Sequence, residues 1–319
     1  MKGLVIGKFL PPHDGHRQLW DFAAASCDEL TIVVEHIAGE SIPSATRVAW
    51  VRELAPRARV VHLDRSMPQQ PSEHDDFWGL WCDTLAALAG RPDLLFASEA
   101  YGAPLARGLG CTFVPVDPAR LGVAISATEV RTDPHAVWRY LPPPVRAHYT
   151  RRIAVVGPES SGKTTLSRQL AEAVGGTWVP EYARAWLESV PDATTDWPRS
   201  LAFIARGQAA QEAALARQST GTLVCDTDGL TTQIWWERLV GEPPAWLVEQ
   251  AQAARYDLTL LCAPDLPWED DPVRYLPEEQ GAFFARFEQG LAEAGRRVVV
   301  VRGADRLQQA VGAWEGLAT

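Results

Sequence analysis

The segment IAVVGPESSGKTTLSRQL, residues 153–170, constrains the fold of this chain more than any other stretch. A short apolar strand runs into a glycine-rich loop that matches G-x-x-x-x-G-K-[ST], and an amphipathic helix follows. The glycines let backbone N–H groups converge on phosphate oxygens, and the start of the helix adds partial positive charge. Strand, loop and helix in this order predict a parallel α/β sheet that binds a nucleotide phosphate at one edge.

The side chains of this loop suit the binding of a nucleoside triphosphate. Lys163 can bridge the β- and γ-phosphates of ATP, and the Thr164 hydroxyl can ligate Mg²⁺. ATP is therefore the expected co-substrate and Mg²⁺ the expected metal. The residues expected to contact ATP are Gly157, Glu159, Ser160, Ser161, Gly162, Lys163, Thr164 and Thr165.

Two acids end the strand-like segment VCDTD, residues 224–228. An Asp at the end of a strand beside a phosphate-binding loop can hold Mg²⁺ or accept the proton of an attacking hydroxyl. We expect Asp226 to have such a catalytic or metal-binding role. Asp228 could bind the substrate, or it could cap the helix that follows it.

The segment PEYARAW, residues 180–186, follows another short strand. Glu181 could bind substrate hydroxyls or act as a base, with Tyr182 and Arg184 near the substrate. The alternative is that Glu181 and Arg184 form an ordinary helix pair at i, i+3.

The segment PWEDDPVR, residues 267–274, is an acidic loop bracketed by prolines. It could be a lid that brings Arg274 onto the transferred phosphate. It could equally be a solvated turn, and the sequence favours the lid only slightly.

Short apolar runs alternate with helical patterns along the whole chain, which predicts parallel sheets covered by helices on both faces. In the first half, strands are expected at 4–9, 29–36, 59–64, 94–99 and 112–117, and helices at about 15–27, 45–55, 74–89, 102–109 and 127–140. In the second half, strands are expected at 153–157, 177–180, 222–228, 257–263 and 296–303, with a long helix at about 198–219.

A chain of 319 residues is too long for most single cores, so two domains are expected. Three consecutive prolines, 142–144, cannot continue a helix, and a polar, basic stretch follows them. We therefore expect the linker near 141–151 and domains at 1–145 and 150–319.

The composition excludes several classes of protein. A net charge of −10 argues against bulk binding of nucleic acid. Five scattered cysteines form neither a zinc motif nor a disulfide framework, which favours a reducing, cytoplasmic location. The chain has no apolar run near the roughly 20 residues that a membrane helix needs, and its N-terminus does not resemble a signal peptide.

The loop GKFLPPHDGH, residues 7–16, follows the first strand and carries His13 and His16. By itself it could be a tight turn with two surface histidines. A phosphate pocket would need further donors from elsewhere in the chain.

The segment ISATEVR, residues 125–131, opens a helix after the last strand of the first half and can supply those donors. Ser126 and Thr128 offer hydroxyls, the helix start offers N–H groups, and Arg131 offers a planar guanidinium. Alone, this segment could be a helix cap with a surface arginine. Together with the histidine loop it predicts a phosphate site.

These two segments are similar to HxGH and ISSTxxR, the two signatures of the nucleotidyltransferase superfamily. With YLPPPVR, GPESSGKTTL, EYAR, CDTDGLTT and PWEDD following in this order, the chain resembles the bifunctional NadR-type family over nearly its whole length. The resemblance implies a Rossmann-like nucleotidyltransferase domain followed by a P-loop kinase domain. It also implies that the first domain makes NAD and pyrophosphate from ATP and NMN, and that the second makes NMN from ATP and ribosylnicotinamide.

The resemblance also implies residue roles. His13 and His16 would contact ATP phosphates, with His16 near the α-phosphate, and Asp226 or Glu181 would accept the proton of the riboside 5′-hydroxyl. The remaining ATP contacts of the first domain, assisted by Mg²⁺, would be Gly7, Lys8, Phe9, Ser126, Thr128 and Arg131. The nucleotide pocket would include Ser98, Glu99 and Tyr101, and the riboside site or its lid Tyr182, Arg184, Asp228 and Arg274.

Some features depart from the family pattern. Ala127 replaces a frequent serine, and Pro180 and Pro272 stand where an aromatic residue and a glycine are expected. Some members carry an N-terminal helix-turn-helix domain, whereas this chain begins at its first strand, so we expect no role in transcription and no nucleic-acid partner. Its expected partners are the small-molecule substrates, and a homo-oligomer stays open.

Two other functions remain open at the level of sequence. The first domain could adenylylate another phosphorylated acceptor, such as phosphopantetheine, because the two signatures do not select the acceptor. The second could be a regulatory module that binds ATP or NAD without catalysis.

Overall fold

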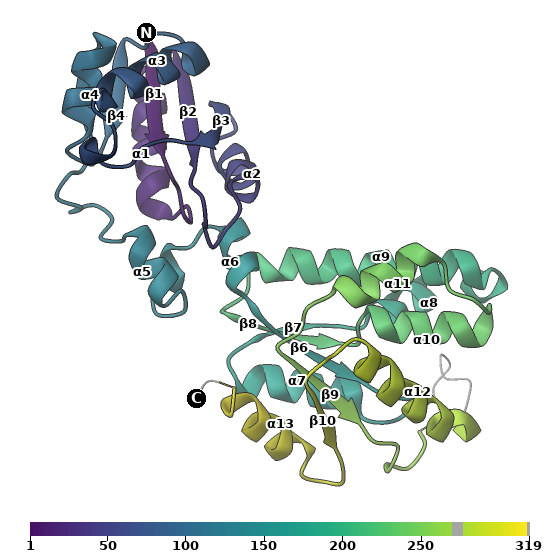
Figure 1. Cartoon of the computed structure of the whole chain (residues 1–319). Helices are drawn as coiled ribbons and strands as arrows, with labels where there is room; N and C mark the ends of the chain where they lie inside the picture. Colours follow the sequence, from purple (N-terminus) through teal and green to yellow (C-terminus); the bar gives the residue numbers. More distant parts are fainter. Residues whose placement is uncertain (270–276, 318–319) are drawn as a thin grey trace. The chain divides into compact units, whose positions relative to one another are not determined.

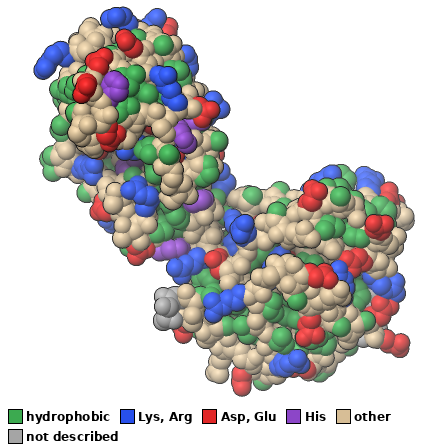
Figure 2. Space-filling model, in the orientation of Figure 1, with side chains coloured by type: hydrophobic (Ala, Val, Ile, Leu, Met, Phe, Trp, Pro, Cys, Tyr) green, Lys and Arg blue, Asp and Glu red, His purple; other side chains and the backbone are tan. Residues whose placement is uncertain are grey.

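The computed structural model describes residues 1–269 and 277–317. The chain divides into two compact units, Met1–Val145 and Arg146–Thr319 (Figure 1). Each unit contains one parallel five-stranded sheet between layers of helices, which confirms the predicted fold class. Acidic and basic side chains are interspersed over the visible surface of each unit (Figure 2).

The first sheet has the strand order β3-β2-β1-β4-β5, and all its strands are parallel. The strands are β1 (Lys2–Gly7), β2 (Glu29–His36), β3 (Arg59–Ser66), β4 (Leu94–Ala97) and β5 (Thr112–Pro115). Strands β2 and β3 lie on one side of β1, and β4 and β5 lie on the other. The loops that follow β1 and β4 therefore lead away from each other. A crevice at the carboxyl ends of the strands is the usual ligand site of such a sheet.

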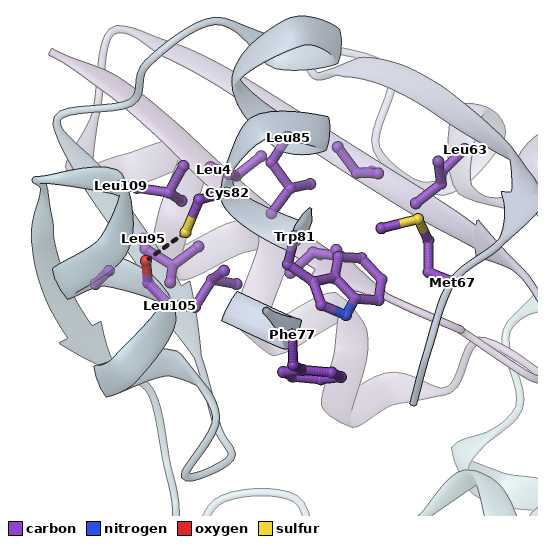
Figure 3. Close-up of a cluster of buried hydrophobic side chains, with 13 residues drawn as sticks. Leu4, Leu63, Met67, Phe77, Trp81, Cys82, Leu85, Leu95, Leu105 and Leu109 are labelled. Atoms are coloured by element: carbon purple, nitrogen blue, oxygen red, sulfur yellow. Dashed lines mark hydrogen bonds between the residues drawn. The ribbon is translucent and has the colours of Figure 1, made fainter. Parts of the chain in front are cut away.

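The helices of this unit cover both faces of the sheet. They are α1 (Asp14–Ser26), α2 (Ser44–Leu54), η1 (Pro71–Glu73), α3 (Phe77–Ala89) and α4 (Gly102–Leu109). Successive residues of β1 point to opposite faces, so Leu4 packs with α3 and α4, and Val5 packs with α1 and α2. Figure 3 shows the first of these clusters, with Trp81 and Phe77 among its side chains. The Trp81 indole N–H donates to the Pro68 carbonyl at 3.0 Å.

The segment 127–140 is not the single helix that its sequence predicts. Helix α5 (Ala127–Thr132) ends early, and a 3₁₀ turn, η2 (Trp138–Tyr140), follows after a gap. The Asp133 side chain accepts the N–H groups of His135 and Ala136, both at 3.0 Å, and so stabilises a turn instead of further helix. Pro134 has no N–H to continue the helical pattern.

The proline segment near the unit boundary begins a helix. This helix, α6 (Pro143–Tyr149), occupies most of the expected linker. Prolines are tolerated in the first turn of a helix, because the N–H groups there have no partner within the helix. The prolines therefore start a new helix and do not continue an earlier one.

The second sheet has the order β10-β9-β6-β8-β7, again all parallel. The strands are β6 (Arg151–Val156), β7 (Thr177–Val179), β8 (Thr222–Asp226), β9 (Leu258–Cys262) and β10 (Val298–Val301). The helices are α7 (Lys163–Ala173), α8 (Tyr182–Ser189), η3 (Ala193–Thr195), α9 (Trp197–Ala216), α10 (Gly229–Leu239), α11 (Ala245–Ala253), η4 (Pro277–Glu279), α12 (Gln280–Glu293) and α13 (Arg306–Glu315). Helices α7 and α13 pack on one face, and α10 and α12 pack on the other.

The described helices include none that is both long enough and apolar enough to cross a membrane.

Candidate active sites

A cavity of about 1150 Å³ lies at the carboxyl ends of the strands in the first unit. It is lined by every residue that the sequence assigned to the first site: Gly7, Lys8, Phe9, His13, His16, Ser98, Glu99, Tyr101, Ser126, Thr128 and Arg131. The fold thus brings two segments more than a hundred residues apart to one cavity.

The two histidines are packed together at the start of α1. Their rings stack with centroids 3.8 Å apart, and the His13 backbone N–H donates to Nδ1 of His16 at 3.3 Å. Phe9 lies edge-on to the His16 ring, with centroids 5.0 Å apart. Because Nδ1 of His16 accepts a hydrogen bond, the neutral ring carries its proton on Nε2, as a donor.

The electrostatic surroundings keep both histidines neutral at pH 7. Burial, with the nearby Arg120 as a smaller cause, lowers the pKa of His13 to about 4. Burial, with His13 and Arg120 as smaller causes, holds the pKa of His16 well below its usual value. Neutral imidazoles can donate to phosphate without bringing a net charge into the cavity.

The segment ISATEVR closes the other side of this cavity. Ser126 caps α5 by accepting the Glu129 N–H at 3.2 Å, and its hydroxyl donates to the Glu129 carboxylate at 2.6 Å. Arg131 donates to the Thr128 hydroxyl at 3.1 Å and to the Leu10 carbonyl, so it joins the two segments. Ser126 is thus a helix cap in this structure, whereas Arg131 is more than a surface arginine.

The second unit has a cavity of about 460 Å³ at the carboxyl ends of its strands. All eight residues expected to contact ATP line it. Gly157 has φ +145°, and a Cβ there would lie 2.7 Å from the Cys262 carbonyl oxygen, so only glycine fits. The Lys163 ammonium donates to the Pro158 carbonyl at 2.8 Å, within the same loop.

Asp226 is fully buried at the end of β8, and it does not itself line this cavity, although the next residue, Thr227, does. Neither of its carboxylate oxygens has a hydrogen-bond partner among the described residues. Burial and the negative charge of Glu181 raise its pKa to about 7, although the nearby Thr164 and Lys163 oppose the shift. Such a carboxylate is destabilising when charged unless a cation compensates it.

These surroundings fit a magnesium ion. Mg²⁺ in nucleotide sites is usually bound by one or two protein oxygens together with substrate phosphates. Asp226 and the Thr164 hydroxyl would provide the protein oxygens, beside the loop that would hold the phosphates.

Glu181 and Arg184 line the same cavity, whereas Tyr182 and Asp228 do not. Asp228 caps α10 by accepting the Thr231 N–H at 3.0 Å, and its other oxygen accepts from Arg296 at 2.7 Å. The capping interpretation therefore describes Asp228, whose carboxylate is fully engaged.

The acidic loop reaches the cavity through its first residues. Pro267 and Glu269 line it, and the Glu269 N–H donates to the Ser160 hydroxyl at 3.2 Å. Arg274, the proposed lid arginine, lies outside the described residues, as does Pro272.

Comparison with known proteins finds relatives over most of the chain. A family model described as an AAA domain matches residues 152–308. Over 297 residues, the chain is 27% identical to the trifunctional NAD biosynthesis/regulator protein NadR of Escherichia coli K12, covering 86% of this chain and 72% of that protein. The chain is thus similar to NadR proteins over most of its length. NadR of Salmonella typhimurium is also 27% identical, covering 95% of this chain and 79% of that protein.

Single-activity proteins and solved structures extend the comparison. The nicotinamide-nucleotide adenylyltransferase of Thermococcus kodakarensis is 24% identical over 57% of this chain and 98% of its own length. A crystal structure of NadR protein in complex with NAD and AMP-PNP superposes with a TM-score of 0.77 at 24% identity, covering 99% of this chain and 96% of that one. At this identity the superposition establishes the NadR fold.

Some residues near the two cavities were not predicted from sequence. Arg47 is fully buried and donates to the carbonyls of Glu35 at 2.9 Å and Lys8, so it fixes the backbone of the histidine loop. Arg306 does the same in the second unit by donating to the carbonyls of Ala263, at 2.9 Å, and Ser161 of the phosphate loop. An arginine within an apolar helical pattern is the only sequence signal for Arg47.

Thr227 and an apolar wall were also missed in the second unit. Thr227 lines the cavity with φ +73°, a conformation that a β-branched residue rarely adopts. Aromatic and aliphatic side chains also line this cavity: Trp197, Leu201, Ile204, Trp235, Leu239 and Phe283. They resemble core positions in sequence, so periodicity alone could not identify them as cavity residues.

Proposed function

We propose that the chain is a bifunctional enzyme of NAD biosynthesis. The first unit would convert ATP and NMN to NAD and pyrophosphate, and the second would convert ATP and ribosylnicotinamide to NMN and ADP. The observation that carries the proposal is that each cavity gathers a complete phosphate-binding set, one of the HxGH type and one of the P-loop type. The likeness to NadR proteins over most of the chain supports the two acceptors.

In the first unit, a phosphate oxygen of NMN attacks the α-phosphorus of ATP, and the bond to pyrophosphate breaks. No protein nucleophile is needed, so catalysis consists of orientation and stabilisation of charge. The Nε2–H of His16 would donate to the α-phosphate, while Lys8 and Arg131 would balance the charge of the leaving pyrophosphate. A neutral His16 can serve as this donor at pH 7 without a change of protonation.

In the second unit, the 5′-hydroxyl of the riboside attacks the γ-phosphorus of ATP, and ADP leaves. Bound Mg²⁺ would neutralise charge on the β- and γ-phosphates. Asp226, beside Thr164, has the better position to bind this metal, whereas Glu181 lines the cavity and can accept the hydroxyl proton. We assign the base role to Glu181 on these positions.

Two assays of the purified chain test this function. With ATP, Mg²⁺ and NMN, NAD and pyrophosphate should form. With ATP, Mg²⁺ and ribosylnicotinamide, NMN should appear first and NAD afterwards. Turnover with phosphopantetheine but not with NMN would overturn the first assignment, and ATP binding without riboside turnover would reduce the second unit to a sensor.

A further inference from the structure

We propose that Gln208 and Gln211 of α9 are positioning residues that hold Glu181 at the riboside for phosphoryl transfer. The proposal rests on the kinase function proposed above. It concerns how the backbone that carries the base is fixed, and which residues outside the sequence motifs do so.

Glu181 lies in the two-residue connection between β7 and α8, and α9 binds the peptide groups on both of its sides. The Pro180 carbonyl accepts from Nε2 of Gln211 at 2.6 Å. The Tyr182 N–H donates to Oε1 of Gln208 at 3.0 Å. Because these two groups belong to the peptide bonds before and after Glu181, the two glutamines fix the backbone from which its side chain extends.

The Glu181 side chain has no such anchor of its own. Within the described part of the chain, no hydrogen bond or salt bridge to the Glu181 carboxylate is present. A carboxylate without these bonds can accept a hydrogen bond from the substrate hydroxyl. Its position is then set mainly by the backbone of Glu181. A misplacement of about 1 Å can cost about a hundredfold in rate.

Hydrogen bonds to other side chains fix the position of Gln208. Gln208 is only 3% exposed, and its Nε2 donates to Glu212 at 3.2 Å. Glu212 also accepts from the Tyr256 hydroxyl, at 2.8 Å to the nearer oxygen. The amide of Gln208 is therefore fixed at both ends, and it cannot rotate without losing a bond.

Helix α9 also approaches the connection closely beside these anchors. A Cβ on Gly207 would lie 2.0 Å from Cε1 of Tyr182, so the tyrosine ring packs directly against the glycine backbone. Next along the chain, the Trp186 indole of α8 donates to the Ser200 hydroxyl of α9 at 3.0 Å. Helix α9 thus packs against the segment that carries Glu181 and fixes its position.

If the two glutamines had a purely structural role, removing one of them would have the same effect as removing any other hydrogen bond between helices. The chain offers a matched control for this possibility. Gln250 of α11 donates to the Ala205 carbonyl of α9 at 3.1 Å, but it does not touch the connection that carries Glu181. Gln211 and Gln250 are both partly buried, and neither lines the cavity. Gln211→Leu and Gln250→Leu therefore remove comparable bonds from the same helix.

The experiment compares the wild type with Gln211→Leu, Gln208→Leu and Gln250→Leu in the full chain. In the first two variants, kcat/KM for the riboside should fall about ten- to a hundredfold, with KM for ATP within about twofold of wild type. Gln250→Leu should retain the wild-type value. Adenylyl transfer to NMN should be unchanged in all three, which shows that the protein is correctly quantified. The retained KM for ATP shows that the second unit is folded.

Separate values of kcat and KM distinguish positioning from loss of stability. Displacing the base should lower kcat for the riboside and leave its KM within about twofold of wild type. This result is expected in Gln211→Leu and not in Gln250→Leu. Amide hydrogen exchange at Tyr182 should become faster in Gln208→Leu, and it reports the anchor without any turnover.

The proposal is overturned if Gln211→Leu and Gln250→Leu lose equal riboside turnover, or if the Tyr182 exchange rate in Gln208→Leu stays at the wild-type value. A wild-type chain that makes NAD from NMN but does not phosphorylate the riboside would instead refute the kinase function. In that case the exchange measurement still tests whether Gln208 anchors Tyr182.

Discussion

The two cavities differ in whether their polar side chains are already neutral or hydrogen-bonded within the protein. In the first unit, His13 and His16 are stacked and neutral, and Arg131 is already bonded to Leu10 and Thr128. In the second, Asp226 is buried without a hydrogen-bond partner among the described residues, and Lys163 bonds only within its own loop. The first site is preorganised for its ligand, whereas the second contains a charge that a cation must balance.

This difference matches the two reactions. Attack by a phosphate at the α-phosphorus needs fixed donors, and these cost no reorganisation when they are bonded in advance. Transfer of the γ-phosphate needs a metal, and a carboxylate without a partner is ready to receive one. Four substitutions test this comparison, in order of decreasing effect.

Lys163→Met should reduce riboside phosphorylation about a thousandfold, because it removes the cation that binds the transferred phosphate. Initial rates with the riboside and with NMN measure the two reactions separately. Adenylyl transfer should remain within about twofold of wild type. A variant that retains riboside turnover would show that the loop does not bind the ATP used in the reaction.

His16→Ala should slow adenylyl transfer about a hundredfold through loss of one donor to the α-phosphate. The wild-type rate should also show no ionisation of His13 or His16 between pH 6 and 8, because their pKa values are lowered, that of His13 to about 4. Steady-state rates across this range check both statements. A rate controlled by a group titrating near 6.5 would contradict the preorganised first site.

Asp226→Asn should abolish most kinase activity and yet stabilise the second unit at pH 8. The folded pKa of about 7 lies above the ordinary aspartate pKa of 3.8, so the native state binds more protons and stability falls as pH rises from about 4 to 7. The gain at pH 8 is at most about 4 kcal/mol, from a shift of roughly three pKa units. Thermal unfolding at pH 5 and pH 8 measures it.

The matched control for this substitution is Asp228→Asn, which weakens a cap and a buried ion pair. That change should destabilise the unit at both pH values. If Asp226→Asn also destabilises it at pH 8, the carboxylate is not an uncompensated charge.

Ser126→Ala should have the smallest effect. The serine caps the six-residue helix α5, so its loss should cost about 1 kcal/mol of local stability. Adenylyl transfer should fall less than about tenfold, mainly through a higher KM for ATP. A loss as large as that of His16→Ala would make the hydroxyl a direct ligand of the reacting phosphate.

The sequence predicted those features of the fold that depend on local patterns of residues. Apolar runs located the strands, and the glycine and histidine loops located both cavities, because a motif specifies its own backbone. It predicted too long a helix after Ser126, because the side chain of Asp133 competes with the helix for backbone N–H groups.

The sequence could not reveal contacts made with distant backbone atoms. The acceptors of Arg47 and Arg306 are carbonyls that the fold alone brings near. Nor could it reveal that Arg296, far along the chain, forms an ion pair with Asp228 and leaves Asp226 without one among the described residues.

The buried clusters that stabilise each sheet lie within one unit. A substitution that disrupts the core of one unit therefore need not unfold the other unit, and each unit can lose its activity separately. Chains damaged in different halves should then complement one another when mixed. A population carrying His16→Ala in some molecules and Lys163→Met in others would still convert the riboside to NAD, with NMN diffusing between them.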